Sequence, residues 1–116
     1  MDIVIYHNPK CGTSRNVLAS IREAGYEPQI IDYLKTPPDR KTLKELLKLM
    51  GKTPREILRK RGTPYEELGL DDPSLTDDQI LDAIENHPIL IERPIVKAGD
   101  RVALCRPAET IKSLLA

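Results

Sequence analysis

Cys11 is the side chain of this sequence best suited to chemistry. It stands in residues 7–15, which read HNPKCGTSR, after one predicted strand and at the start of a predicted helix. Free N–H groups at a helix N-terminus stabilise a thiolate, and Lys10, Arg15 and a protonated His7 would add cations that act in the same direction. Because the thiolate is the nucleophilic form, the segment predicts a reactive cysteine. The alternative is a small buried thiol that only packs.

Ser14 stands three residues after Cys11, where C-x-x-C redox proteins carry their second cysteine. A hydroxyl cannot resolve a disulfide, but it could hydrogen-bond the thiolate. A site with a single cysteine needs a thiol from elsewhere, such as glutathione or another protein. Cys105 is a candidate for that thiol within the chain, but it follows the apolar residues 102–104, which favours a buried position at a strand end.

An oxyanion at Cys11 would need arginines from other parts of the chain. Val17 occupies the position at which the phosphatase loop C-x5-R carries its arginine. Guanidinium groups suit tetrahedral oxyanions because they offer paired donors and stay charged. Arg93 and Arg106 bracket a predicted hairpin, so they can lie side by side. The alternative is that these arginines and Arg59 are ordinary surface residues; the sequence alone favours that for Arg59 and does not decide for the other two.

Two further residues, His7 and Pro94, are candidates for the site, and a zinc site is excluded. His7 lies four residues before Cys11, which favours a role beside the thiol over a neutral ring that only caps a turn. Pro94 precedes a β-rich run and could form a cis peptide bond beside the thiol, although the sequence does not decide the isomer. Two cysteines and two histidines are too few for a zinc site with structural spacing, so we expect no metal.

The elements that position the thiol alternate at the start of the chain. Residues 3–6 form a β-rich run that stops at the turn signal of residues 7–9. Helical spacing of apolar residues predicts a helix over residues 13–24, closed by Gly25. Residues 29–33 indicate a second strand. This order favours a parallel strand pair joined by a right-handed crossover.

The middle of the chain is predicted to be helical. After the break at residues 36–39, where Asp39 can cap the helix, apolar residues at helical spacing predict a helix that ends at Gly51. A short helix is expected from Thr53 to about Gly62, and residues 63–75 are expected to be irregular. The capping box TDDQ then begins another helix. The apolar face of the first of these helices comprises Leu43, Leu46, Leu47 and Met50.

The end of the chain returns to strands. Residues 95–97 and 101–104 flank Ala-Gly-Asp, a spacing that suits an antiparallel hairpin, and Pro107 opens a terminal helix. Periodicity therefore predicts an α/β sandwich with a small mixed sheet. The length suits a single domain over residues 1–116.

The composition excludes several classes of function. The 18 basic and 18 acidic residues give zero net charge, and the four tyrosines are the only aromatic residues, which argues against general nucleic-acid binding. No apolar run approaches the roughly 20 residues that span a bilayer, so we expect no membrane partner. The N-terminus carries no secretory signal, and two cysteines form no disulfide framework, so we expect a cytoplasmic protein.

The chain resembles the glutaredoxin-coupled arsenate reductases. The likeness begins with YHNPKCGTSRN at residues 6–16 and continues, in order, over nearly the whole chain. Each matching piece is short, and their combination is specific. The other matching segments are YLKTPP at 33–38, LRK at 58–60, PYEELGL at 64–70, HPILIERPIV at 87–96 and LCRP at 104–107.

The resemblance implies a thioredoxin-like sandwich with a four-stranded mixed sheet and a helical insertion between its two halves. It implies that Cys11 attacks the arsenic of arsenate, expels water and leaves a covalent adduct. Glutathione, a co-substrate and not a bound cofactor, would attack that adduct. Glutaredoxin would then take up the glutathione in a mixed disulfide, so that arsenite departs from Cys11.

The resemblance also implies roles for individual residues. In similar proteins the position of His7 is associated with the lowered pKa of the thiol, and that of Ser14 with support of the thiolate. Cys105 matches a cysteine that similar reductases do not need. The positions that hold the oxyanion and its adducts match Arg59, Arg93 and Arg106.

Two other functions stay open. The fold is also similar to that of Spx-like regulators, which bind RNA polymerase, and such a protein would use its thiol to sense redox state. The three arginines at oxyanion-binding positions count against this alternative, because a sensor needs no such cradle. The other alternative is a general glutathione-dependent thiol transferase, which would reduce mixed disulfides without arsenate.

Overall fold

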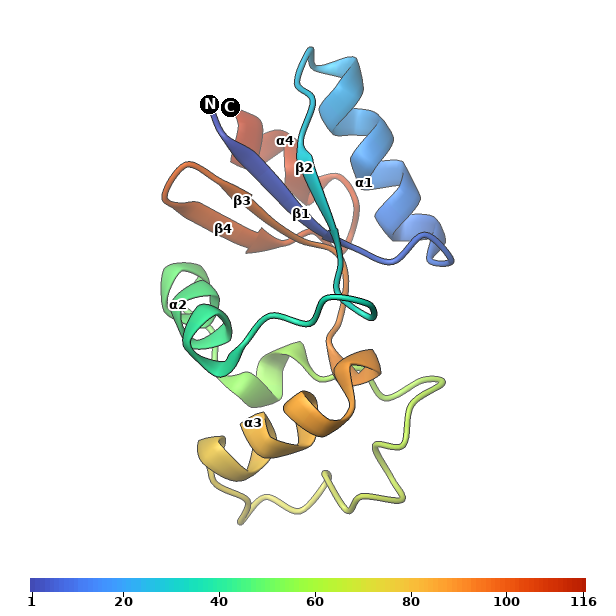
Figure 1. Cartoon of the computed structure of the whole chain (residues 1–116), viewed down its shortest axis with the longest axis vertical. Helices are drawn as coiled ribbons and strands as arrows, with labels where there is room; N and C mark the ends of the chain where they lie inside the picture. Colours follow the sequence, from blue (N-terminus) through green and yellow to red (C-terminus); the bar gives the residue numbers. More distant parts are fainter. The chain divides into compact units, whose positions relative to one another are not determined.

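The computed structural model describes all 116 residues, which form two compact units (Figure 1). The sheet unit comprises Met1–Thr36 and Arg93–Ala116, and the helical unit comprises Pro37–Glu92. The helical unit is therefore inserted, in the sequence, between the two halves of the sheet unit. This is the order expected of a helical insertion, and the expectation of one domain over the whole chain stays a prediction.

A four-stranded mixed sheet organises the sheet unit, in the order β2-β1-β3-β4. Its strands are β1 (Ile3–His7), β2 (Gln29–Asp32), β3 (Ile95–Ala98) and β4 (Arg101–Leu104). β1 pairs in parallel with β2 and antiparallel with β3, and β3 forms a hairpin with β4. The predicted parallel pair and the predicted hairpin are both confirmed.

Two helices pack with the sheet around an aliphatic core. They are α1 (Gly12–Glu23) and α4 (Thr110–Leu115), which lie beside each other along the sheet (Figure 1). The pairing of Ile5 with Val96 places their side chains on the same face of the sheet. Burial of these groups, at about 25 cal/mol per Å² of apolar surface, stabilises the layer. The buried core comprises Ile3, Ile5, Val17, Ile21, Val96, Ala98, Cys105, Ile111 and Leu114.

Local capping signals set the helix boundaries of the helical unit. α2 (Arg40–Met50) begins where the Asp39 carboxylate accepts a hydrogen bond of 2.8 Å from the Thr42 N–H, and it ends at Gly51, whose φ is +69°. α3 (Asp77–Asn86) begins with the predicted capping box, in which Thr76 and Gln79 exchange hydrogen bonds. None of the helices of the chain combines the length and apolar character that crossing a membrane requires.

The boundaries of some helices differ from the prediction, and a contact between residues distant in the sequence explains one of them. The expected short helix is the 3₁₀ turn η1 (Pro54–Ile57), which ends early because Leu58 is extended and bridges to Ile91. A second 3₁₀ turn, η2 (Pro88–Leu90), follows α3. The terminal helix begins at Thr110 and not at Pro107. The peptide bonds before Pro94 and Pro107 are both cis.

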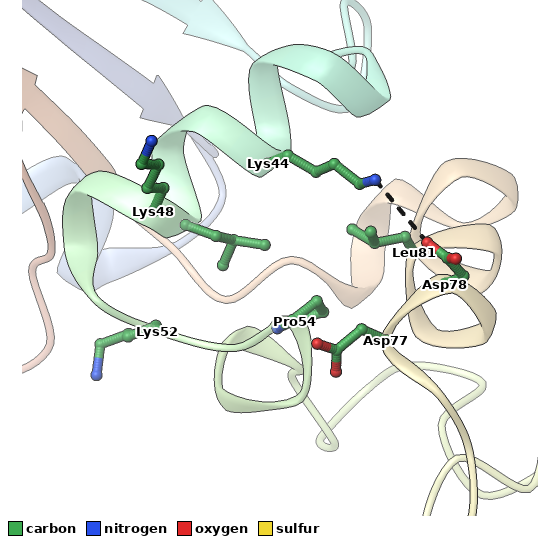
Figure 2. Close-up of a pocket in the computed structure, with 8 residues that line it drawn as sticks. Lys44, Lys48, Lys52, Pro54, Asp77, Asp78 and Leu81 are labelled. Carbon is green, nitrogen blue, oxygen red and sulfur yellow. Dashed lines mark ion pairs between the residues drawn. The ribbon is translucent and has the colours of Figure 1, made fainter.

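Ion pairs link α2 to α3 in the helical unit. Arg40 pairs with Asp82, and also with Glu85 at 2.6 Å (Nε to Oε1), while Lys44 reaches Asp78 at 3.9 Å. A groove of about 420 Å³ opens between these helices over Leu47, Pro54 and Leu81. Figure 2 shows Lys48 and Lys52 pointing away from Asp77 and Asp78, so Lys44 alone of the three lysines along this groove pairs with an aspartate there.

Candidate active site

Cys11 is the N-cap residue of α1, as the sequence predicted. Its backbone is extended (φ −94°, ψ 122°), and its side chain is half-buried. β1 ends at His7, and a tight turn closed by a 3.0 Å hydrogen bond from the Cys11 N–H to the Asn8 carbonyl carries the chain into the helix. The thiol therefore lies at the point where the first N–H groups of α1 have no helical partner.

Asn8 holds this turn together and was not predicted as a site residue. It is buried, and its side-chain Oδ1 accepts a hydrogen bond of 3.0 Å from the Lys10 N–H. On the outside of the turn, Arg15 Nη1 donates to the Pro9 carbonyl at 2.9 Å. The Asn8-Pro9 pair predicts a turn. The burial of Asn8 could not be predicted, because it depends on how the turn packs against the rest of the sheet unit.

Opposing effects act on the Cys11 thiol. Partial burial on its own raises the pKa of this thiol, but hydrogen bonds to the sulfur from the Ser14 N–H and from Arg106, the positive charge of Arg106 and the Thr13 N–H together hold it below its ordinary value. The donors are those expected at a helix N-terminus. Lowering the pKa increases the fraction of nucleophilic thiolate at neutral pH.

Arg106 is the cation that the fold brings to the thiol. Its Nη1 lies 3.7 Å from Cys11 Sγ and donates a hydrogen bond of 3.0 Å to the Arg93 carbonyl. The hairpin explains this position, because Ile95 pairs with Leu104 and the Cys105 N–H continues the ladder to the Pro94 carbonyl at 2.9 Å. The next positions outward are Arg93 and Arg106, so the expectation that they lie side by side is confirmed.

The Arg93 guanidinium is buried and lies over an aromatic ring. Its Cζ is 5.9 Å from the centroid of the fully buried Tyr33 ring, a cation–π geometry. Tyr33 follows β2 directly and was not predicted as a site residue. In the sequence Tyr33 stands out only as the first residue of the matching segment YLKTPP. The spacing of residues around Cys11 gives no reason to select it.

Ser14 and His7 form a buried pair beneath the turn. The Ser14 Oγ accepts a hydrogen bond of 3.1 Å from the Asn8 N–H and lies 2.6 Å from His7 Nδ1. The hydroxyl that was expected to support the thiolate is thus bound to other groups, and Ser14 reaches the sulfur through its backbone N–H instead. The roles of His7 and Ser14 in activating the thiol stay predictions, with this different route.

His7 would add a cation beside Cys11 only if its ring were protonated, and its surroundings disfavour the protonated form. Burial lowers the pKa of His7, Asp32 opposes that effect, and the charges of Arg15 and Arg22 lower the pKa further, so that it lies below the ordinary value. A neutral ring with its proton on Nε2 can accept the Ser14 hydroxyl hydrogen at Nδ1. His7 therefore orders the loop as a neutral ring and does not supply a cation at neutral pH.

Cys105 is buried at a strand end, as expected. Burial raises the pKa of this thiol to about 12, and the nearest polar partner of its sulfur is the Ala103 carbonyl at 3.9 Å. A thiol of this kind is almost wholly protonated at neutral pH. These contacts do not suit a resolving cysteine.

Arg59 lies in the helical unit, directly after the bridge between Leu58 and Ile91. Its Nη1 pairs with Glu92 Oε1 at 2.8 Å, and its Nε donates to the Arg61 carbonyl at 3.0 Å. The role of Arg59 toward an oxyanion stays a prediction. No group of three or more histidine, cysteine, aspartate and glutamate side chains gathers to hold a metal ion.

Comparison with known proteins decides the family. The sequence model of the ArsC family matches residues 6–114. The chain belongs to the ArsC family. This ArsC-family chain is 52% identical to an arsenate reductase of Rhizobium meliloti (strain 1021) over 115 residues, which cover 99% of the chain and 82% of the relative. It is 53% identical to an arsenate reductase of Escherichia coli (strain K12) over 114 residues, covering 98% and 81%.

A solved structure supports the same membership. The arsenate reductase from Vibrio cholerae matches this ArsC-family chain with a TM-score of 0.92 and 42% sequence identity, over 97% of each chain. The predicted thioredoxin-like fold, with its four-stranded mixed sheet, is confirmed.

Proposed function

We propose that this protein is an arsenate reductase that uses glutathione and glutaredoxin in the reducing cytoplasm. Relatives that carry the name arsenate reductase are more than half identical to the chain, which supports the substrate. The observation that carries the proposal is the Cys11 thiol at the N-terminus of α1 with Arg106 Nη1 at 3.7 Å. This arrangement supplies both a nucleophile and a cation for an anionic substrate.

The first step is attack of the Cys11 thiolate on the arsenic of arsenate. An S–As bond forms, one As–O bond breaks, and the oxygen leaves as water after it takes up protons. Thiolate and oxyanion repel each other, so the step needs positive charge fixed beside the sulfur before they meet. Arg106 is proposed to lower this barrier, and its hydrogen bond to the Arg93 carbonyl supports this role because it limits the movement of the guanidinium.

Arg93 and Arg59 are proposed as further donors to the arsenate oxygens. Guanidinium groups stay charged throughout the reaction and offer several N–H donors in a fixed plane. The resemblance to the family carries both assignments. Together with the N–H groups at the start of α1, these arginines would hold the oxyanion while its charge changes during the reaction.

Reduction needs two thiols from outside the chain. The glutathione thiolate displaces a second arsenate oxygen as water, while the arsenic stays As(V). The glutaredoxin thiolate then attacks the glutathione sulfur, and an S–S bond forms between them. The bond between glutathione sulfur and arsenic breaks, and its electron pair passes to arsenic, which becomes As(III). Water finally breaks the bond to Cys11 and releases arsenite. The buried, high-pKa Cys105 supports an external reductant.

A coupled assay tests the proposal. NADPH oxidation is followed with glutathione, glutathione reductase and glutaredoxin, with and without arsenate. We expect turnover that depends on arsenate, disappears in Cys11→Ser and persists in the matched control Cys105→Ser. Full activity of Cys11→Ser would overturn the proposal. Turnover of a mixed disulfide with none of arsenate would replace it by the thiol transferase.

A further inference from the structure

The Arg59 guanidinium is held from two sides within the helical unit. Glu92 Oε1 accepts from Nη1 at 2.8 Å, and the Arg61 carbonyl accepts from Nε at 3.0 Å. The side chains of Arg59 and Glu92 are both only 22% exposed, so water screens this ion pair less than a pair at the open surface. Two contacts on one plane fix the orientation of the guanidinium as well as its position.

The remaining terminal nitrogen of Arg59, Nη2, has no hydrogen-bond partner in the structure. Because the guanidinium is planar, fixing Nε and Nη1 determines where the two N–H groups of Nη2 point. The arginine is thus held with one donor pair available, the arrangement that a monodentate contact to an oxyanion needs.

The ion pair is not required to hold its two chain segments together. The Arg59 N–H donates to the Leu90 carbonyl, and the Glu92 N–H donates to the Ile57 carbonyl, each at 2.8 Å. These two backbone hydrogen bonds enclose the bridge between Leu58 and Ile91. The segments are therefore already paired by backbone, and the carboxylate has a separate effect on the side chain.

We propose that Glu92 is a positioning residue for arsenate binding, acting through Arg59. It holds Nη1 so that Nη2 is presented to an oxygen of the oxyanion. This inference rests on the proposed function, because it assumes that Arg59 binds arsenate. A carboxylate can also weaken anion binding through its own charge, and the two effects predict opposite changes in the affinity for arsenate.

The test compares Glu92→Gln, Arg59→Ala and the double variant in the coupled assay. Glu92→Gln keeps the side-chain shape and the backbone hydrogen bonds but removes the charge. We expect it to raise the KM for arsenate about three- to tenfold with kcat changed less than about twofold, since a positioning loss acts on oxyanion binding. We expect a larger rise in Arg59→Ala and no further rise in the double variant.

A matched control and a second readout separate positioning from stability. Glu27→Gln removes the carboxylate of another arginine pair, that of Arg22 with Glu27 at 3.1 Å, and should leave the KM unchanged. Protection of Cys11 by arsenate against iodoacetamide, measured without glutathione, reports oxyanion binding without turnover. In Glu92→Gln this protection should need about three- to tenfold more arsenate, in parallel with the KM.

The outcomes distinguish the two proposals. An unchanged or lower KM in Glu92→Gln, with a raised KM in Arg59→Ala, overturns the role of Glu92 and leaves that of Arg59 in place. An unchanged KM in Arg59→Ala overturns both. Equal effects of Glu92→Gln with and without Arg59 would show that Glu92 acts through another group, which also overturns the inference.

Discussion

The two cysteines of the sheet unit carry the same side chain in opposite surroundings. Cys11 lies at a helix N-terminus, where backbone N–H groups and Arg106 approach its sulfur. Cys105 is fully buried beside the Ala103 carbonyl. Burial raises the pKa of both thiols, and only at Cys11 do donors and a cation outweigh it.

The difference teaches that the reactivity of a thiol depends on what approaches the sulfur and not on the side chain. The N–H donors at Cys11 come from the next turn of its own helix, while its cation comes from the far end of the chain. The N–H donors lower the pKa of Cys11 through residues close to it in the sequence. The cation lowers it only when the hairpin that carries Arg106 is correctly paired. Each can be removed separately.

The largest expected effect is in the alkylation of the two thiols at neutral pH. With a pKa of about 12, only roughly one Cys105 in 10⁵ is a thiolate at neutral pH, and burial further limits access to it. Iodoacetamide should therefore modify Cys11 alone, as mapped by peptide mass spectrometry. Unfolding in urea should expose Cys105 as the control. Equal modification of both thiols in the folded protein would contradict the comparison.

Ser14→Ala separates the hydroxyl of this residue from its backbone. The variant leaves the buried Asn8 N–H and His7 Nδ1 without their partner, so we expect the free energy of unfolding to fall by about 1–3 kcal/mol. The pH midpoint of Cys11 alkylation should hardly move, because alanine keeps the N–H that reaches the sulfur. Urea unfolding measures the first quantity, and Ser20→Ala in the same helix is the control. A large shift in the midpoint would show that the hydroxyl acts on the thiolate.

Arg106→Ala removes the distant contribution to the thiol. Loss of the hydrogen bond and of the positive charge should raise the pKa of Cys11, so the alkylation midpoint moves to higher pH. At neutral pH we expect alkylation to slow by roughly three- to tenfold. Arg15→Ala is the matched control, because Arg15 binds the Pro9 carbonyl on the outside of the turn. An equal effect of both variants would mean that general positive charge, and not contact, lowers the pKa.

His7 gives the smallest expected effect, in the dependence of stability on pH. Its pKa is lowered in the folded protein, so the unfolded chain takes up the proton first as the pH falls below about 6.5. Its stabilising contribution is complete above that value and is lost on acidification. The difference in free energy of unfolding between the natural protein and His7→Asn should therefore shrink from about pH 7.5 to about pH 5. A constant difference would show that His7 keeps its ordinary pKa.

The sequence was sufficient for features that depend on neighbouring residues. Asp39, Gly51 and the Thr76 capping box mark helix ends through contacts within one turn, and the structure confirms all three. The position of Cys11 at the start of α1 follows from the same kind of signal. The side-by-side placement of the two hairpin arginines was also predictable, because a hairpin with a short turn has one natural register.

Features that depend on tertiary packing were not predictable. The short helix after Thr53 ends early because Leu58 pairs with Ile91, a residue far along the chain. The sequence left open whether His7 is protonated, because the burial that lowers its pKa is a tertiary feature. The bond between His7 and Ser14 requires the exact path of the turn between them, which the residue types alone do not specify.

The hairpin turn carries a constraint on chain length that is remote from the thiol. Gly99 and Asp100 form a two-residue connection between the paired residues Ala98 and Arg101, and Gly99 has a φ of +64°. Exposed loop tips ordinarily tolerate insertions. Here an inserted residue that shifts the register between β3 and β4 by one position would turn every side chain of β4 to the opposite face of the sheet. Arg106, which follows β4, would be displaced as well. The length of this tip therefore helps to set where Arg106 lies relative to Cys11, through the register of the hairpin.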